Sequence, residues 1–252
     1  MQVFKTTKPA IYNPREGVSS AARSHQGCVR KKNEDAVLSR PELALWVVAD
    51  GMGGHLAGDY ASQCIVECMD KLTLPILKQQ GVSSVENILR QADQSIRHYG
   101  QQVLGGKTVG STVCVLLLEA KQAHCFWMGD SRIYRFRQGQ LAALTSDHSQ
   151  AMQLFEQGLI PAEEVDKHPS SHVLTRAMGC NVFDLAYRVF DVQAGDKFLL
   201  CSDGLYAELS VEDMSQIIAQ FSAEDCAEKL VQLCLERGAR DNVSLVCIDT
   251  GR

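Results

Sequence analysis

Residues 111–144 read STVCVLLLEAKQAHCFWMGDSRIYRFRQGQLAAL, and this stretch decides the fold. Its apolar runs are separated by short polar breaks, which predicts consecutive β-strands with no helix between them. A Gln138-Gly139 turn joins the last two of the four strands that we expect, at 111–119, 122–129, 132–137 and 140–144. Strands that follow one another in a block favour antiparallel sheets over the alternating order of a doubly wound parallel fold.

Further strands are expected on both sides of this block. Residues 43–49, within LALWVVAD, are apolar on both faces of a strand, which predicts that the strand is buried. The remaining strands are expected at 17–24, 184–192, 196–201 and 243–249.

Helices are expected between the strand blocks. Apolar residues at helical spacing predict a long helix over 57–79, and residues 148–158 also look helical. Another helix should run from Ser83 to about Leu104. Three capping boxes mark expected helix starts, at Ser83-x-x-Glu86, Ser210-x-x-Asp213 and Ser222-x-x-Asp225.

The order of these elements predicts an α+β fold with helices layered outside antiparallel sheets. We expect a four-layer αββα sandwich, in which two antiparallel β-sheets are flanked by helix pairs. No low-complexity segment, internal repeat or Pro/Ser-rich linker divides the chain, so residues 1–252 should form a single domain.

An irregular segment interrupts the pattern at 159–173, where two prolines leave room for one helical turn. It lies between the motifs LTSDHS (144–149) and LTRAMG (174–179). We therefore expect a flap, over about 149–173, beside a functional site.

The composition, 45% hydrophobic and 22% charged over 252 residues, is that of a globular protein with a sizeable core. A net charge of −5 and no basic run longer than Arg30-Lys31-Lys32 argue against nucleic-acid binding. The N-terminus lacks the apolar region of a secretory signal, and no uncharged apolar run approaches about 18 residues. Ten scattered cysteines without a Cys-x-x-Cys pair indicate reduced thiols. We expect a cytoplasmic protein with no membrane partner.

Four short acidic stretches lie at distant points of the chain: Asn33-Glu34-Asp35, Asp50-Gly51, Asp203-Gly204 and Asp241-Asn242. The last three adjoin apolar strand-like runs, so neighbouring strands could bring their carboxylates into one pocket. Without a cation, two carboxylates 4 Å apart would repel by about 4 kcal/mol at an effective dielectric near 20. Asp-Gly and Asp-Asn are also common turn pairs. Either the carboxylates lie apart in turns or they hold divalent metal ions, and we favour the metal ions.

Residues near these stretches suit hard cations such as Mg²⁺ and Mn²⁺, which take oxygen ligands from carboxylates, backbone carbonyls and water. Gly51 has no side chain to shield its carbonyl, although a glycine-rich turn alone would explain it. Asp130, in MGDSR, is either a further ligand or a cap for the next hairpin. Arg30 could bind a phosphoryl group bidentately, or it could be a solvated surface residue.

Between about Gly17 and Asp249 the chain carries, in order, the motifs VRKKNED, VVADGMGG, GSTV, MGDSR, LTSDHS, LTRAMG, CSDGL and RDNVS. In this order they resemble the metal-dependent Ser/Thr protein phosphatases of the 2C type, the PPM family, in their compact bacterial form. The resemblance covers nearly the whole chain. It implies a single phosphatase domain, a β-sandwich between two helical layers, and a binuclear Mn²⁺ or Mg²⁺ centre at one end.

The resemblance also implies the ligands of that centre. Asp50 would bridge the two metal ions, and the carbonyl of Gly51 would bind one of them. Asp203 and Asp241 would hold the other metal ion.

Further residues would support this centre by the same resemblance. Glu34 and Asp35 would act directly or through metal-bound water, and Asp130 with Asp203 could hold a weaker third metal ion. Arg30 would bind the substrate phosphate.

The implied mechanism is in-line attack on phosphorus by a hydroxide that bridges two metal ions, without a covalent enzyme intermediate. Some family members, chiefly eukaryotic, carry a His directly after the Asp-Gly pair as a proposed general acid. Here that position is Met52, which cannot donate a proton, so the identity of the acid stays open.

We therefore expect a Ser/Thr protein phosphatase that is a monomer and opposes a bacterial Ser/Thr kinase. Its partners would be phosphorylated proteins, including that kinase or its substrates. One alternative is a non-catalytic phosphoprotein-binding module of the same fold, which predicts missing ligands, whereas every expected carboxylate is present. The other is a metallohydrolase of small phosphate esters, which the ligands alone do not exclude.

Overall fold

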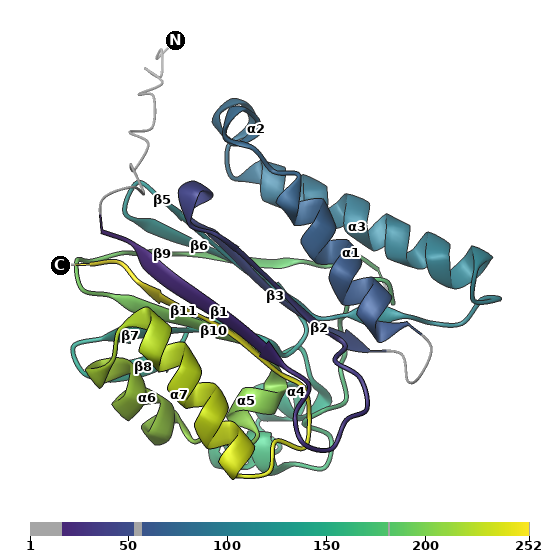
Figure 1. The fold of residues 1–252 in the computed structure, drawn as a ribbon. Helices are drawn as coiled ribbons and strands as arrows, with labels where there is room; N and C mark the ends of the chain where they lie inside the picture. The colour runs from purple at the N-terminus through teal and green to yellow at the C-terminus, as the bar shows by residue number, and fades with distance from the viewer. Residues whose placement is uncertain (1–16, 53–56, 181, 252) are drawn as a thin grey trace.

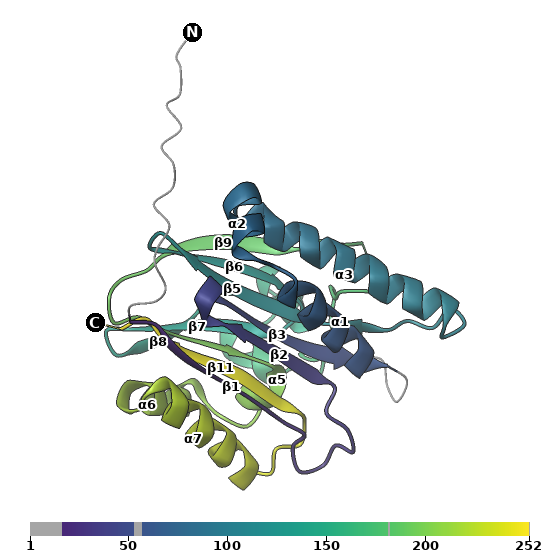
Figure 2. The same ribbon diagram turned by 45° about the horizontal axis from the view of Figure 1, so that its top comes forward.

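The computed structural model describes residues 17–52, 57–180 and 182–251. Two antiparallel sheets pack face to face, and helices cover the outer face of each (Figures 1 and 2). This arrangement confirms the predicted α+β fold of four layers.

The first sheet has its strands in the order β2-β3-β5-β6-β9, with a short β4 beside β3. Helices α1 and α3 lie across its outer face (Figure 1). Its strands are β2 (Asp35–Arg40), β3 (Leu45–Met52), β4 (Gly110–Ser111), β5 (Val113–Glu119), β6 (Gln122–Met128) and β9 (Ala186–Asp191). The helices on this side are α1 (Gly58–Asp70), α2 (Leu74–Gln80) and α3 (Ser83–Gln102).

The second sheet has the order β1-β11-β10-β7-β8, and helices α6 and α7 cover it (Figure 2). Its strands are β1 (Ser19–His25), β7 (Arg132–Arg137), β8 (Gln140–Ala143), β10 (Lys197–Cys201) and β11 (Val243–Asp249). The covering helices are α6 (Val211–Gln220) and α7 (Ala223–Glu236). The short helices of the fold are η1 (Pro41–Leu43), α4 (Gln150–Glu156), η2 (Ala162–Lys167) and α5 (Asp203–Tyr206).

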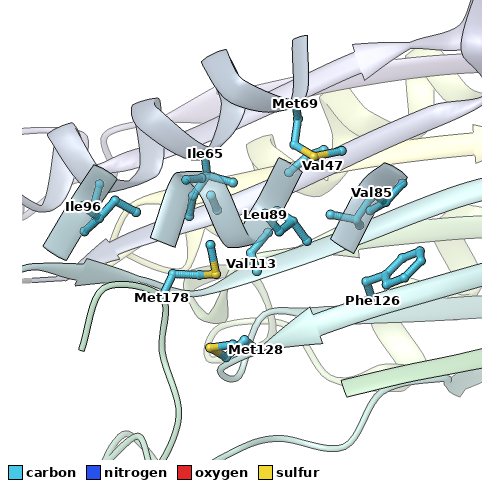
Figure 3. Close-up of a cluster of buried hydrophobic side chains, with 14 of the residues drawn as sticks. Val47, Ile65, Met69, Val85, Leu89, Ile96, Val113, Phe126, Met128 and Met178 are labelled. Carbon is cyan, nitrogen blue, oxygen red and sulfur yellow. The ribbon is translucent and has the colours of Figure 1, made fainter. Parts of the chain in front are cut away.

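An apolar core joins α1 and α3 to the first sheet (Figure 3). Ile65 of α1 and Leu89 of α3 are fully buried against Val47 and Val113 of the sheet. Burying each such side chain contributes roughly 1.5–3 kcal/mol relative to leaving it in water. The packing fixes the helices on the sheet and gives the strand ends a rigid base.

Strand β3 is buried on both of its faces, as the run LALWVVAD predicts. Val47 and Ala49 face the helices, whereas Trp46 and Val48 belong to the core between the two sheets. Successive side chains of a strand point to opposite faces, so a strand between two apolar layers needs this continuous hydrophobic sequence.

The prediction of a single helix over 57–79 is wrong, because the structure has two helices there, α1 and α2. Lys71 caps the end of α1, and Pro75 lies in the first turn of α2. Proline lacks the N–H that a continuous helix would need at this point, and its ring clashes with the preceding turn.

The three predicted capping boxes differ in how far the structure confirms them. The box at Ser210 is present in full. At Ser222 the hydroxyl accepts a bond from the backbone N–H of Asp225, so the cap is confirmed without the reciprocal bond. The box at Ser83 is wrong: Ser83 donates to the carbonyl of Gln80 instead, since α2 ends only a few residues earlier.

Strand β2 and helix α5 are elements that the sequence patterns did not indicate. The β2 sequence DAVLSR is short and mixed in polarity, and only its pairing with β3 makes it a strand. The expected flap contains α4 and η2, and an isolated bridge between Ser149 and Leu174 closes its base. Among the described residues, no helix is both long enough and apolar enough to cross a membrane.

Candidate active site

The predicted site residues gather around one cavity of about 920 Å³ at the strand ends. Asp35 is the exception, since it lies behind the cavity wall. The predicted residues that line the cavity are Arg30, Glu34, Asp50, Gly51, Asp130, Asp203 and Asp241. The structure therefore brings together acidic stretches that are up to about 200 residues apart in sequence.

Asp35 and Asp50 are directly opposite each other in the β2–β3 pair. The hydroxyl of Ser202 donates to Asp35 Oδ2 at 2.8 Å, whereas Asp35 Oδ1 is buried and has no hydrogen-bond partner in the described part of the chain. Burial raises the pKa of Asp35 to about 7. Burial, followed by repulsion from Asp35, raises the pKa of Asp50 well above its usual range.

The two Asp-Gly pairs are not turns. Gly51 lies in β3 and Gly204 in α5, and neither has the positive φ angle that turn glycines often adopt. A Cβ atom at Gly51 would collide with the carbonyl oxygen of Gly58, and one at Gly204 would collide with that of Asn242. Glycine is thus required for close approach of the backbone, which argues against the turn alternative at both pairs.

Asp203 and Asp130 approach the cavity from the two different sheets. Asp203 follows β10 as the first residue of α5, and its Oδ1 atom is buried with no hydrogen-bond partner from any residue that the structure describes. Asp130 follows β6 and is only 4% exposed, and Tyr206 donates to its backbone carbonyl at 3.0 Å. Burial, together with repulsion from Asp203, raises the pKa of Asp130 to about 8.

Arg30 lies at the rim of the cavity. Its Nη2 atom donates to Asp241 Oδ2 at 2.6 Å, and this bond raises the pKa of Arg30. The side chain remains 54% exposed, so the guanidinium can also meet a ligand in the cavity. Arg30 therefore lines the cavity, which argues against the alternative that it is only a solvated surface residue.

Asn242 holds the loop that carries Arg30 and Glu34. Its side-chain nitrogen donates to the carbonyls of Gln26 and Lys32 at 2.8 and 2.9 Å, and its oxygen accepts from the backbone N–H of Glu34 at 2.9 Å. The motif RDNVS contains this residue, but its sequence neighbours gave no indication of the loop that it binds.

His172 is a cavity residue that sequence reasoning missed. It comes from the flap, and its Nδ1 atom lies 3.5 Å from Asp203 Oδ2. The carboxylate of Asp203 raises the pKa of His172. The only nearby signal is the spacing His168-x-x-x-His172, and His168 does not line the cavity, so the folded flap is what reveals the position of His172.

The donor set fits divalent cations. Carboxylates dominate the cavity, and buried oxygens of Asp35 and Asp203 have no hydrogen-bond partner among the described residues. Buried carboxylates without partners are costly, and oxygen-rich sites of this kind suit Mg²⁺ and Mn²⁺. Burial first, and then repulsion from neighbouring carboxylates, raises the pKa of Asp50 and of Asp130, and a bound cation would oppose both effects.

Comparison with known proteins decides the family. A profile of protein phosphatase 2C matches residues 23–236 of this chain. The chain belongs to the protein phosphatase 2C family.

Relatives within the protein phosphatase 2C family support this assignment. The Ser/Thr protein phosphatase PstP of Mycobacterium tuberculosis is 31% identical over 229 residues, which cover 91% of this chain and 44% of PstP. The chain thus spans less than half the length of that relative. A solved structure of PppA from Pseudomonas aeruginosa has a TM-score of 0.81 at 38% identity, covering 92% of this chain and 97% of that one.

A further solved structure bears on the cation site of this protein phosphatase 2C. The catalytic domain of PstP in complex with two manganese ions has a TM-score of 0.82 at 29% identity, covering 94% of this chain and 99% of that chain. The comparisons confirm the predicted membership of a family of metal-dependent Ser/Thr protein phosphatases.

Proposed function

We propose that this protein hydrolyses phosphoserine and phosphothreonine esters on proteins, with two divalent cations of the Mn²⁺ or Mg²⁺ type. The observation that carries the proposal is the cavity itself. Carboxylates from both sheets converge there, an exposed arginine lies at the rim, and Asp203 Oδ1 is buried without a hydrogen-bond partner among the described residues.

The cations would be held by Asp50, the carbonyl of Gly51, Asp203 and Asp241, with support from Glu34 and Asp35. Bound there, they would lower the pKa of water and offset the charge on phosphoryl oxygens. The related PstP structure with two manganese ions supports this stoichiometry. Asp130 stands close enough to Asp203 to share a further cation.

Arg30 would bind and orient the phosphoryl group. A guanidinium can donate two parallel hydrogen bonds to phosphate oxygens, which fixes the direction from which a nucleophile can attack. The bond to Asp241 holds one edge of the Arg30 guanidinium. Asn242 anchors the loop behind it, and so the pocket positions the arginine before substrate binds.

The shape of the site favours proteins over small phosphate esters as substrates. A second cavity, of about 380 Å³, adjoins the first and shares His172, Glu208 and Arg240 with it. It continues along the flap and is lined by Asp166 and Lys167. An extended peptide could occupy this second cavity while its phosphorylated side chain reaches the carboxylates.

The remaining predictions complete the proposal. Residues 1–252 would form one phosphatase domain with a flap over about 149–173, and residues 1–16 lie outside the described part. All ten cysteines are free thiols, which supports a reducing, cytoplasmic compartment. The substrates would be phosphoproteins, including a cognate Ser/Thr kinase or its targets, and we retain the prediction of a monomer.

Hydrolysis of p-nitrophenyl phosphate by the purified chain tests the activity. Turnover should require Mn²⁺ or Mg²⁺ and stop with EDTA. A phosphothreonine peptide should be a better substrate than a small sugar phosphate. Absence of turnover with every metal would favour the non-catalytic phosphoprotein-binding module. Preference for the sugar phosphate would favour the metallohydrolase of small phosphate esters.

A further inference from the structure

Helix α3 contains a buried carboxylate that lies outside the catalytic cavity. The side chain of Asp93 is 4% exposed, and it pairs with Arg97 on the next turn of the helix. The bond from Arg97 Nε to Asp93 Oδ2 is 2.7 Å long. Two exposed residues at this spacing would support the helix equally well, and burying a charge is costly. The burial of Asp93 therefore draws attention to its second contact.

The second contact of Asp93 is with the chain that leaves the flap. Asp93 Oδ1 accepts a hydrogen bond of 2.7 Å from the backbone N–H of Gly179. Gly179 ends the motif LTRAMG, which directly follows the flap. Its φ angle is +80°, and a Cβ atom there would lie 2.3 Å from a methyl carbon of Ile96 in α3. Only glycine permits so close an approach to the helix, and Asp93 binds the chain at that point.

The residue before Gly179 pairs with β4. The backbone N–H of Ser111 donates to the carbonyl of Met178 at 3.1 Å, and the N–H of Met178 donates to the carbonyl of Ser111 at 2.9 Å. Met178 is fully buried in the apolar core that also contains Ile96 (Figure 3). The end of the flap is therefore held from two directions, by α3 and by β4.

Strand β4 connects this segment to the strand end that carries Asp50 and Gly51. Ser111 lies opposite Gly51 in the β3–β4 pair, and the backbone N–H of Thr112 donates to the carbonyl of Asp50 at 2.8 Å. Asp50 and Gly51 are proposed cation ligands. The next residue of the segment, Cys180, lines the catalytic cavity. An unbroken series of contacts thus joins α3, the end of the flap and the proposed cation ligands.

We propose that Asp93 is a positioning residue of the phosphatase, although it touches neither substrate nor cation. Its bond to Gly179 keeps the end of the flap paired with Ser111, and this pairing holds the strand end of Asp50 in the position that binds cations. A carboxylate suits this task, because a hydrogen bond to a charged acceptor is roughly twice as strong as one to a neutral acceptor. The role rests on the proposed function, which supplies the cations.

Three variants of the full chain separate the Gly179 bond from the ion pair. Asp93→Ala removes both, and Asp93→Asn keeps a neutral acceptor for Gly179. Arg97→Gln is the matched control, because it removes only the ion pair. Hydrogen exchange at the Gly179 amide, measured by nuclear magnetic resonance of the metal-free protein, reports the bond itself. Calorimetric titration with Mn²⁺ and the kinetics of a phosphothreonine peptide report the state of the cavity.

In Asp93→Ala the Gly179 amide should exchange about 10–100-fold faster than in wild type, since a hydrogen bond to a charged group shifts a local opening equilibrium by about that factor. Mn²⁺ binding should weaken by about tenfold, the lower end of what partners of metal ligands contribute. Turnover of the peptide should fall at low Mn²⁺ and largely recover at saturating Mn²⁺. Asp93→Asn should lie between Asp93→Ala and wild type in each measurement, and Arg97→Gln should match wild type.

Equal exchange of the Gly179 amide in wild type and Asp93→Ala would overturn the proposal. Equal losses of Mn²⁺ affinity in Asp93→Ala and Arg97→Gln would also overturn it, because they would show only a structural ion pair. If Asp93→Ala does not fold, the other two variants decide. Asp93→Asn must then exceed Arg97→Gln in Gly179 exchange and in loss of Mn²⁺ affinity, and the reverse order would overturn the proposal.

Failure of the proposed function gives a different result. A wild-type chain that binds no Mn²⁺ and hydrolyses no phosphate ester would refute the proposed function, and the positioning role with it. A wild-type chain that does both, beside an Asp93→Ala variant with the same Mn²⁺ affinity and turnover, would refute the positioning role alone.

Discussion

Two groups of buried charge each contact the flap, and they differ in their balance of positive and negative charge. In the first, Arg132 is 11% exposed and meets the 7% exposed Asp147 through bonds of 2.7 to 3.2 Å. Arg132 also bonds Asp166 in the flap at 2.5 Å and lies over the ring of Tyr206. Burial raises the pKa of Asp147, and the bonds from Arg132 oppose the rise.

In the second group, carboxylates such as Asp50 and Asp203 gather around the cavity with Arg30 at its rim, and buried oxygens of Asp35 and Asp203 have no hydrogen-bond partner among the described residues. The difference teaches how to distinguish the two kinds of buried charge. A buried ion pair whose hydrogen bonds are satisfied holds the structure together, whereas a buried group of like charges marks a place where a ligand must bring the opposite charge.

The largest effect should follow from removing one charge of the unbalanced group. Asp50→Asn should lower phosphatase turnover by at least about 10³-fold, since a bound metal ion supplies several kcal/mol of transition-state stabilisation. The metal-free variant should be as stable as wild type or more so, because one repelling charge is gone. Reaction rates with Mn²⁺ measure the turnover, and thermal unfolding in EDTA measures the stability of the metal-free protein. Full activity, or a fall in stability, would contradict the metal assignment; Glu67→Gln on the exposed face of α1 is the control.

Breaking the ion pair between Arg132 and Asp147 should have the opposite effect on stability, which should fall. Arg132→Met should lower the free energy of unfolding by about 3–5 kcal/mol, because Asp147 is left buried without its partner. Adding Asp147→Leu should restore much of that loss. Urea unfolding of the single and double variants measures the effect. A single variant within about 1 kcal/mol of wild type would show that the pair is not structural.

Arg30 is the cation that touches the edge of the unbalanced group, and its loss should have an intermediate effect. Arg30→Ala should lower kcat/KM for a phosphopeptide by about 10–100-fold, since a hydrogen bond to a charged group contributes about 1.5–3 kcal/mol. Arg30→Lys should recover only part, because Lys cannot donate bidentately. Arg240→Ala, at the same cavity, should change kcat/KM much less. Equal effects of the two alanine variants would remove the special role of Arg30.

The smallest effect, taken per pH unit, should be the pH dependence of stability that the buried carboxyls of the unbalanced group create. The raised pKa values of Asp35, about 7, and Asp130, about 8, mean that the folded metal-free protein binds protons that the unfolded chain releases near pH 4. Its stability should therefore be greatest near pH 4 to 5 and should fall as pH rises to 8, by up to about 1.4 kcal/mol per pH unit for each carboxyl.

Thermal unfolding in EDTA from pH 5 to pH 8 measures this fall. Added Mn²⁺ should stabilise the protein more at pH 8 than at pH 6, because more of the carboxyls are then ionised. If the melting temperature in EDTA did not fall between pH 6 and pH 8, the carboxyls of Asp35 and Asp130 would not be as deeply buried as the structure places them.

The fold could be predicted from the sequence where one strand or helix carries its own pattern. Strand β3 is apolar at every position from Leu45 to Ala49, and the capping box at Ser210 is complete within four residues. Strand β2 and the break before Pro75 were missed or misjudged. Strand β2 forms only because it pairs with β3. The break before Pro75 was missed because apolar residues on both sides of it keep helical spacing.

The same distinction applies to the site. Asp50, Asp203 and Asp241 could be predicted because each lies where a strand ends or begins, and strand ends meet at an edge of the sandwich. The roles of Asn242 and His172 could not, since their partners are in a distant loop and across the cavity. Tertiary contacts alone define such residues.

The position of β11 has a consequence for how long the cavity takes to form during folding. It lies between β1 and β10, and its register pairs Ser19 with Asp249, which are 249 − 19 = 230 positions apart (Figure 1). Closing so long a loop makes this pairing slow. Asp241 and Asn242 directly precede β11, so the cavity can be complete only after β11 has been synthesised and paired. Limited proteolysis of arrested nascent chains should show protection of β1 only after β11 has left the ribosome.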